Sequence, residues 1–321
     1  MAQRRIALKT IAASLLACAC AGTAFAQPFP SRPVTLIVPF GPGGTSDIMA
    51  RALQQPLAAA LNGSVVIDNK AGAGGAIGMQ QLQRAKPDGY TVGLSVIGPE
   101  VLQPALRKTG YTHADFDHIC GTYAVPLMMM VPADSQFKSA KDVVEFAKAN
   151  PGKLAYGSSG NGTILHLSMA MLMDKVGGEG LHVPFKSTGE MVTGLLGKQV
   201  MLFNETPTIA KRYNLRPLAV FADKRLEAYP QVPTMAEAGF EVMPASVWGG
   251  VIAPKGLPAD VAKTLEQACQ KATHTQEYRA QADKFETPLV YRSGAEFAKF
   301  VQGQAEAYGK LANSLGLAQK E

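Results

Sequence analysis

The stretch VTLIVPFGPGGTSDIMARAL, residues 34–53, decides how the rest of the chain is interpreted. Its β-branched apolar beginning is typical of a buried strand, and from Asp47 onward apolar residues recur at helical intervals. Between the two lie Gly41, Gly43 and Gly44. A glycine-rich turn that leads from a strand into a helix lets backbone N–H groups approach an anion at the positive end of the helix dipole. The stretch therefore predicts an anion-binding loop.

The same strand-and-helix order continues beyond this loop. Strands are expected at 34–40, 63–69 and 90–97, with helical periodicity in 47–62 and 76–89 between them. This alternation predicts a parallel sheet covered by helices. A proline at position 56 lies inside the first helix and is expected to kink or shorten it.

A second α/β unit follows an extended segment at 116–132. Ser139 and Asp142 predict a capped helix start, and strands and helices then alternate as far as a second extended segment at 241–253. The MMM run at 128–130 is interpreted as core of the first extended segment. The two extended segments are interpreted as crossings between lobes.

The C-terminal part is expected to form helices over 258–272 and 293–316, the latter opened by an S-x-x-E capping box. If these helices return to the first unit, the fold class is α/β, a clamshell of two α/β lobes joined by two crossover strands. Lobe 1 would comprise 27–124 and 248–321, and lobe 2 would comprise 125–247.

Residues 1–26 have the pattern of a secretory signal peptide, with a basic start, an apolar middle and a small-residue cleavage site. We therefore expect export to the periplasm, although the segment also has incomplete features of a twin-arginine signal and of a lipoprotein box. Removal of the segment lowers the formal net charge from +6 to +3, and no basic cluster follows, which argues against a nucleic-acid-binding protein. No later apolar run is long enough to span a membrane.

Two cysteines lie beyond the predicted signal peptide, Cys120 and Cys269. In an oxidising compartment they could form a disulfide, but the sequence favours two buried thiols. Neither a C-x-x-C pattern nor paired histidine spacing is present, so no metal site and no cofactor are expected.

Three strand-to-helix turns carry the candidate binding chemistry: 41–47, 71–78 and 157–163. In open α/β sheets such turns lie at the ligand-binding edge. Their hydroxyl and amide side chains add hydrogen-bond donors, which come from Thr45, Ser46, Ser158, Ser159, Asn161 and Thr163.

Each of the three turns approaches a catalytic or phosphate-binding motif but lacks one of its residues. The first turn lacks the lysine of a P-loop, the second lacks the last glycine of the dinucleotide fingerprint, and the third lacks the last glycine of a nucleophile elbow. His166 is interpreted as a packing or supporting residue rather than a base. Asp47 is interpreted either as a partner of a ligand amine or hydroxyl or as an acidic residue in the first turn of a helix.

With these residues in view, the chain resembles the Bug family, the periplasmic solute-binding proteins of tripartite tricarboxylate transporters. The resemblance rests on SRPVTLIVPFGPGG, VVIDNKAGAGGAIG, KPDGYT, ANPGKLAYGSSGNGT, HVPFK, LRPLAV and VPTMAEAGF, in this order over nearly the whole chain after residue 26. It implies a type II periplasmic-binding-protein fold that closes over a small carboxylate and delivers it to the membrane subunits of a transporter.

The resemblance also implies a set of ligand-binding residues. Backbone and hydroxyl groups of both turns, often through waters, and the segment SVIGP (95–99) would surround the carboxylate: Gly43, Gly44, Thr45, Asp47, Ser95, Ile97, Ser158, Asn161, Gly162 and Thr163. Two departures from the family concern the ligand. Phe185 and Ser187 replace a usual tyrosine and glycine, and Asn204 and Glu205 occupy a strand end where many members have an aspartate.

Specificity would come from residues that meet the rest of the ligand, for which Phe40, Ile97, Phe203 and Asn204 are the candidates. These residues favour an aromatic or compact acid over citrate. Two alternatives stay open: a sensor that presents its closed form to a membrane receptor, and an exported α/β hydrolase.

Overall fold

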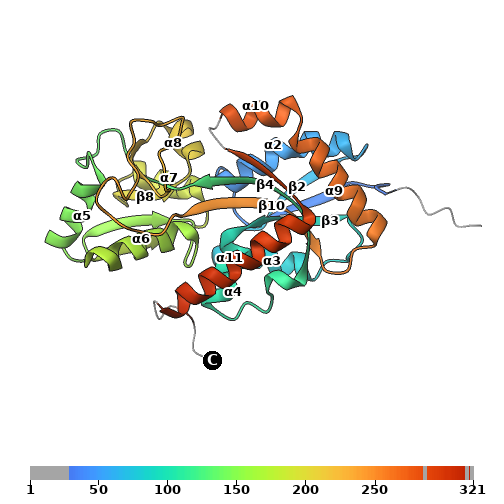
Figure 1. Ribbon diagram of the computed structural model, residues 1–321, viewed down its shortest axis with the longest axis horizontal. Helices are drawn as coiled ribbons and strands as arrows, with labels where there is room; N and C mark the ends of the chain where they lie inside the picture. The colour runs from blue at the N-terminus through green and yellow to red at the C-terminus, as the bar shows by residue number, and fades with distance from the viewer. Residues whose placement is uncertain (1–28, 285–287, 315–317, 319–321) are drawn as a thin grey trace, which may run out of the picture.

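The computed structural model describes residues 29–284, 288–314 and 318. The predicted signal peptide, residues 1–26, lies outside the described residues. The chain forms two β-sheets, each covered by helices, which lie side by side along the long axis of the molecule (Figure 1). Within the described part of the chain, no helix is both long and apolar enough to cross a bilayer.

The first sheet has the strand order β11-β4-β10-β3-β1-β2. β1 pairs in parallel with β2 and β3, whereas β10 runs antiparallel to β3 and β4. The predicted parallel unit is therefore confirmed within a mixed sheet. Its strands are β1 (Val34–Val38), β2 (Val65–Asn69), β3 (Thr91–Val96), β4 (Phe116–Pro126), β10 (Ser246–Pro254) and β11 (Leu289–Ser293).

Helices from both ends of the chain pack on this first sheet. α2 contacts β1, β2 and α9, α3 contacts β3, and α11 contacts β4 and β11. The C-terminal helices therefore return to the first unit, as predicted. The helical elements of this part are α2 (Thr45–Ala60), η1 (Ala73–Gly75), α3 (Ala76–Gln83), η2 (Gly98–Leu102), α4 (Gln103–Leu106), η3 (His113–Asp115), α9 (Ala259–Thr273), α10 (Gln276–Lys284) and α11 (Gly294–Ser314).

The predicted shortening of the first helix at Pro56 is wrong, because α2 continues through Pro56 to Ala60. Proline removes one backbone hydrogen bond and crowds the preceding turn. The burial of Leu53 and Leu57 on either side of Pro56 holds the helix against the core. Packing thus outweighs the local preference to break.

The second sheet has the strand order β7-β6-β8-β5-β9. β6 runs parallel to β7 and β8, and β5 runs antiparallel to β8 and β9. Its strands are β5 (Met128–Val131), β6 (Leu154–Ser158), β7 (Gly180–Pro184), β8 (Leu202–Glu205) and β9 (Arg216–Val220). Its helices are α5 (Ala140–Ala149), α6 (Ile164–Val176), α7 (Thr188–Leu196) and α8 (Pro207–Tyr213). The predicted cap of α5 is confirmed, because Ser139 and Asp142 form a reciprocal capping box.

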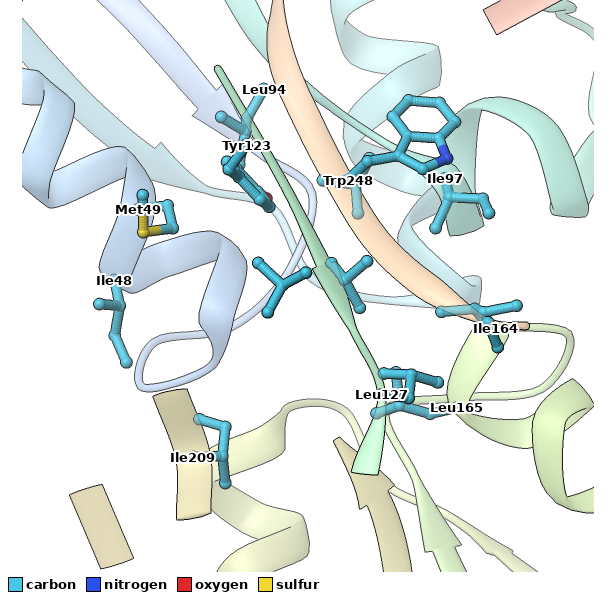
Figure 2. Close-up of a cluster of buried hydrophobic side chains, with 14 of the residues drawn as sticks. Ile48, Met49, Leu94, Ile97, Tyr123, Leu127, Ile164, Leu165, Ile209 and Trp248 are labelled. Carbon is cyan, nitrogen blue, oxygen red and sulfur yellow. The ribbon is translucent and has the colours of Figure 1, made fainter. Parts of the chain in front are cut away.

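Two adjacent strands connect the lobes. β4 and β10 pair antiparallel as far as Ser246 opposite Pro126, and one residue later the chain enters β5 of the second sheet. Figure 2 shows buried side chains of both lobes around this crossing, with Ile48 and Met49 from α2 of the first lobe and Ile164 and Ile209 from α6 and α8 of the second. The 128–130 methionines are fully buried in this core, as expected.

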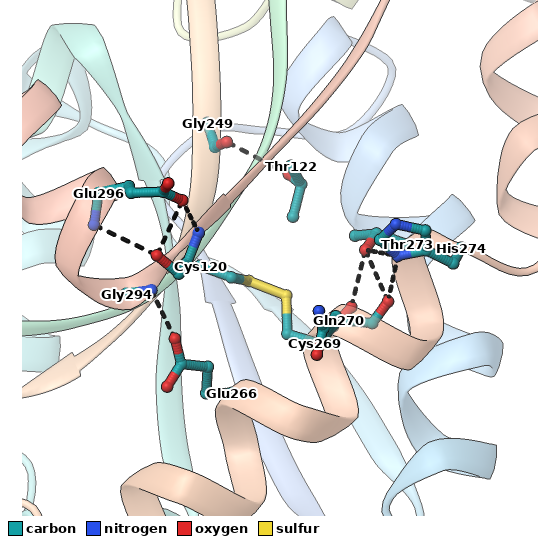
Figure 3. The surroundings of a disulfide bond; sticks show 11 residues. Cys120, Thr122, Gly249, Glu266, Cys269, Gln270, Thr273, His274, Gly294 and Glu296 are labelled. Atoms are coloured by element: carbon teal, nitrogen blue, oxygen red, sulfur yellow. Dashed lines mark hydrogen bonds between the residues drawn. A yellow bond between two sulfur atoms is a disulfide. The ribbon is translucent and has the colours of Figure 1, made fainter.

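Cys120 of β4 and Cys269 of α9 form a disulfide, with 6.5 Å between their Cα atoms (Figure 3). The sequence-based preference for two free buried thiols is therefore wrong. Sequence spacing gave no signal for the pair, because 149 residues separate the two cysteines and only the return of α9 to the first sheet brings them together. The disulfide attaches the C-terminal helices to one of the two crossing strands.

Candidate functional site

A small cavity lies between the lobes, where the N-terminal ends of α2, α6 and α7 meet. It measures about 30 Å³, room for roughly two waters. The lobes also touch directly beside it, because Gln103 Nε2 donates a hydrogen bond to the Asn161 carbonyl oxygen at 2.7 Å. The cavity is lined by Phe40, Gly41, Gly44, Thr45, Ser46, Val96, Ile97, Gly98, Ser159, Thr163, Ile164, Leu165, Thr188, Glu205 and Val247.

The loop before α2 supplies one wall of this cavity. Gly44 is the N-cap residue of α2 and has no side chain to cap the first-turn N–H groups, and Gly44, Thr45 and Ser46 all line the cavity. A Cβ atom added to Gly44 would lie 2.8 Å from Oγ1 of Thr188 in the opposite lobe. Glycine at this position therefore lets the two lobes close on each other.

The loop before α6 supplies the facing wall. Gly160 and Gly162 adopt φ angles of 126° and 71°, which are left-handed values that favour glycine. Thr163 caps α6, since its hydroxyl accepts a hydrogen bond from the His166 N–H at 3.4 Å and donates to the Gly160 carbonyl at 2.9 Å. Thr163 and its neighbours Ser159 and Ile164 line the cavity.

Glu205 is the one ionisable side chain among the described residues that line the cavity, and it is only 3 % exposed. Its carboxylate accepts hydrogen bonds from Thr45 Oγ1 at 3.2 Å, from Thr188 Oγ1 at 2.9 Å and from the Thr206 N–H at 2.9 Å. Burial raises the pKa of Glu205, although these hydrogen bonds oppose the shift.

Sequence reasoning named Asn204 at this strand end instead of Glu205. The structure places Asn204 away from the cavity lining, fully buried, with its Nδ2 donating to Ser168 Oγ at 2.9 Å. Consecutive residues of a strand point to opposite faces, so only one of the two can face the cleft. Phe203 is also fully buried in the sheet and does not line the cavity.

A second, larger cavity of about 220 Å³ adjoins the first, and Phe40 and Ser159 line both. Its wall includes the glycines of 72–75, the predicted site residue Asn161, and two cationic side chains, Arg107 and Lys186. The residues that line the smaller cavity are nearly all buried, whereas several that line the larger one are exposed. We call the two cavities the inner and outer cavities.

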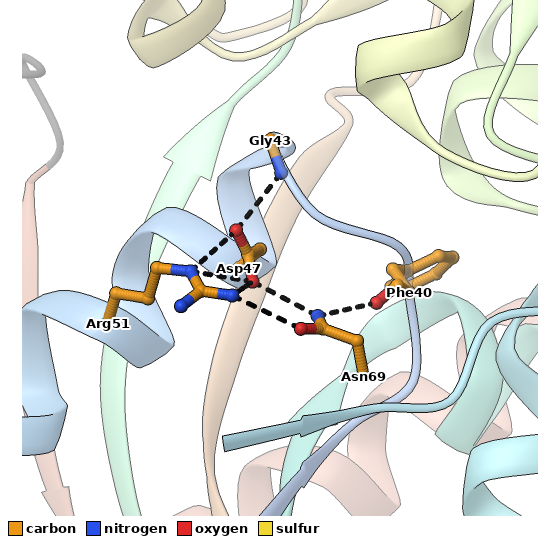
Figure 4. A network of polar contacts seen from close by, with 5 residues as sticks. All are labelled: Phe40, Gly43, Asp47, Arg51 and Asn69. Atoms are coloured by element: carbon orange, nitrogen blue, oxygen red, sulfur yellow. Dashed lines mark hydrogen bonds and ion pairs between the residues drawn. The ribbon is translucent and has the colours of Figure 1, made fainter. Parts of the chain in front are cut away.

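Gly43 and Asp47 lie outside both cavities and line a separate open hollow beside Arg51. Asp47 accepts hydrogen bonds from the Gly43 N–H at 3.0 Å, from Arg51 Nε at 3.0 Å and from Asn69 Nδ2 at 3.0 Å (Figure 4). Burial alone would raise the pKa of Asp47, but the hydrogen bonds outweigh it and hold the pKa below its usual value. The structure thus assigns Asp47 to the second of its two interpretations, an acidic residue that fixes the start of α2.

Three other predicted site residues use their polar groups within the protein. Ser95 donates to Glu100, and the Gly162 N–H donates to His166 Nδ1 at 3.1 Å. Ser158 Oγ accepts from the Gly160 N–H at 3.2 Å. These residues shape the loops and do not line the inner cavity, whereas Phe40, Gly44, Thr45, Ile97 and Thr163 do.

Ser158 Oγ also lies 2.7 Å from His182 Nε2, which is the spacing of a nucleophile and its base. Ser158 is fully buried and lines neither cavity, however, and burial together with the nearby His166 lowers the pKa of His182 to about 4. No carboxylate orients His182 in the contacts of the described residues. The pair therefore lacks the access and basicity that a hydrolase needs.

Thr188 and Glu205 are the lining residues with polar side chains that sequence reasoning missed. A signal existed for Thr188, because it opens a helix directly after the strand that ends at Pro184, like the residues of the three turns that were singled out. For Glu205 the signal was only its place at a strand end. Among the described residues, no group of His, Cys, Asp and Glu is arranged to hold a metal ion.

Comparison with known proteins assigns the chain to a family. Residues 49–317 match the model of the tripartite tricarboxylate transporter family receptor. A Cupriavidus necator protein, described as a UPF0065 protein in the gbd 5' region, is 34% identical over 321 residues, covering 99% of this chain and 98% of the relative. Protein BugT of Bordetella pertussis is 32% identical over 281 residues, covering 83% of this chain and 84% of BugT.

Solved structures agree with this assignment. The periplasmic binding protein BugD superimposes with a TM-score of 0.86 at 30% identity, covering 91% of this chain and 100% of BugD. A Rhodopseudomonas palustris protein solved with adipate superimposes with a TM-score of 0.85 at 29% identity, covering 90% of this chain and 99% of that one. The chain belongs to the tripartite tricarboxylate transporter receptor family, a family of periplasmic solute-binding proteins, and the predicted Bug resemblance and clamshell fold are confirmed.

Proposed function

From its place in this receptor family, we propose that the chain captures a small organic carboxylate between its lobes in the periplasm and delivers it to a tripartite tricarboxylate transporter. The observation that carries the proposal is the convergence of three helix N-termini, α2 from one lobe and α6 and α7 from the other, on one inner cavity. Helix N-termini stabilise anions through free N–H groups and the helix dipole.

The helix ends and hydroxyls in the cavity lining offer hydrogen-bond donors to a carboxylate without any basic side chain. Among its described residues none is lysine, arginine or histidine, while hydroxyls of Ser46, Ser159 and Thr163 accompany the helix ends. A hydrogen bond to a charged group contributes roughly 1.5–3 kcal/mol net. A few such bonds, less the cost of closure, are of the order needed for micromolar binding, about −8 kcal/mol.

The apolar residues of the lining bear on the class of acid that is bound. Phe40 and Ile97 line the cavity and favour an aromatic or compact acid, and the adipate-bound relative shows that a related protein accommodates an organic acid.

We place the lobe boundaries at 124/125 and 247/248, which the change of sheet between β4 and β5 supports. The signal-peptide pattern of 1–26 supports export.

Ligand-dependent thermal unfolding tests this proposal. The mature protein is heated with a panel of mono-, di- and tricarboxylates, aromatic acids and amino acids, because a ligand that binds only the native state raises the unfolding temperature. Gly44→Val should abolish the shift, since its side chain would meet Thr188 across the cleft. Gly303→Val is the matched control, because a Cβ at Gly303 has no neighbour within 4 Å. No shift with any acid, or an equal shift in Gly44→Val, would refute the proposal.

Transport and sensing use the same binding site and differ only in the membrane partner. Uptake of the identified ligand by cells that contain the membrane subunits, with and without this chain, separates them. Loss of uptake without the chain supports delivery to a transporter, and unchanged uptake supports the sensor alternative.

A further inference from the structure

The buried carboxylate of Glu205 is the feature of the inner cavity that the capture of a simple acid leaves unexplained. A site for an anion is expected to have donors, yet here one wall is itself an acceptor that is 3 % exposed. An acidic residue at this position would repel a carboxylate ligand, unless something in the closed site compensates its charge.

The lining of the inner cavity provides no basic side chain to do so. The hydrogen bonds of Glu205 come from threonine hydroxyls and one backbone N–H, all of them neutral. Arg107 and Lys186 belong to the outer cavity, and neither lines the inner one. A carboxylate ligand without a positive charge would place two anions in one small chamber of low dielectric, where their repulsion is poorly screened.

The hydrogen bonds that Glu205 accepts favour its ionised form against the effect of burial. One oxygen accepts from Thr45 and the Thr206 N–H, and the other accepts from Thr188. These donors are all neutral, so the negative charge of the carboxylate has no cationic partner in the inner cavity. An ammonium group donates three hydrogen bonds and carries the charge that the site needs.

We propose that the ligand is an amino acid or a related carboxylate that carries an ammonium group, with its carboxylate at the helix N-termini and its ammonium on Glu205. This inference rests on the proposed function and narrows its ligand class. It also accounts for the position of Glu205 at the end of β8, opposite the loop before α2, because the two charged groups of such a ligand lie only a few bonds apart. The remainder of the ligand would extend past Phe40 and Ser159, which line both cavities, into the outer cavity.

Matched ligand pairs test the inference by titration calorimetry on the mature protein. Each pair contains an amino acid and the same acid without its amino group: alanine and propionate, aspartate and succinate, phenylalanine and 3-phenylpropionate. We expect at least one amino acid to bind tenfold or more tightly than its partner. Glu205→Gln should reduce this preference to less than threefold, because the amide cannot supply a negative charge.

Two further variants make the test specific. Glu190→Gln removes one negative charge from the same lobe at an exposed residue of α7 and should leave the preference unchanged. Glu205→Asp keeps the charge and should keep a preference for the amino acid. The wild-type comparison stands by itself if Glu205→Gln does not fold.

The outcomes separate this inference from the proposed function. One outcome is tighter binding of the acids that lack the amino group, with a binding heat that depends on the buffer because protons are taken up. This would mean that Glu205 binds a proton when the ligand binds. It would overturn this inference but not the proposed function. Equal preference in wild type and Glu205→Gln would also overturn it. Absence of binding for every acid of the panel would overturn the proposed function itself.

Discussion

His166 and His182 form a stacked pair next to the loop before α6, and their burial predicts that the free energy of unfolding falls at acidic pH. The rings of His166 and His182 lie 3.8 Å apart at an angle of 13°. His166 Nδ1 accepts a hydrogen bond from the Gly162 N–H, so this nitrogen carries no proton. His182 Nε2 contacts the Ser158 hydroxyl. Burial lowers the pKa of both histidines, and the neighbouring His166 lowers that of His182 further, to about 4.

The direction of the effect follows from proton binding. In the unfolded chain His182 titrates near 6.5, so between pH 6.5 and 4 the unfolded state binds more protons than the folded state. The stability contributed by neutral His182 is therefore fully present above pH 6.5 and is lost as the pH falls toward 4. Between pH 7 and pH 5 the loss is about 2 kcal/mol if the full shift applies, and about 1 kcal/mol after allowance for the partial exposure of the ring.

Denaturant unfolding at pH 7 and pH 5 measures this loss. His182→Phe keeps a ring in the stack but cannot take up a proton, so its free energy of unfolding should fall by about 1 kcal/mol less than that of the wild type over the same interval. His274→Phe, which changes an exposed histidine outside the stack, serves as the control. The same pH dependence in His182→Phe as in the wild type would refute the reasoning.

Two further predictions concern residues away from the inner cavity. Replacing Cys120 and Cys269 together by alanine should lower the free energy of unfolding by about 2–5 kcal/mol, because the disulfide closes a long loop of the unfolded chain; an unchanged denaturation midpoint under oxidising conditions would contradict this. Asp47→Asn should lower stability at pH 7 by about 1–3 kcal/mol through its hydrogen-bonded ion pair with Arg51, while the Kd for the ligand changes less than about threefold. A large rise in Kd with unchanged stability would instead return Asp47 to the binding site.

The local sequence predicted those parts of the fold that short-range patterns encode. The strands around 34–38, 65–69 and 91–96 follow from β-branched apolar runs, and the start of α5 follows from its capping box. α10 and β11 were not predicted. α10 is largely polar, and β11 pairs with β4 over only a few residues with a register shift, so neither carries a strong periodic pattern.

The candidate site was predicted at the level of its loops but not of each side chain. The turns before α2 and α6 are glycine-rich, and both contribute to the inner cavity as expected. Which residues of a loop face the ligand depends on its φ and ψ angles and on partners far along the chain. Asp47 could not be assigned without Arg51 and Asn69, because the helix places the first beside it and a neighbouring strand places the second.

Glu205 shows why long-range contacts decide which residues line the cavity. In the sequence it differs little from Asn204, since both are polar residues at the end of a strand. The strand pleat turns one toward Ser168 in the core and the other toward Thr45 of the opposite lobe, so the closure of the lobes gives Glu205 its place in the cavity. A contact between residues 160 positions apart couples closure to the charge of the site. A ligand with the proposed ammonium group would therefore stabilise the closed form as well as fill the cavity, because it would neutralise the carboxylate that Thr45 contacts across the lobes.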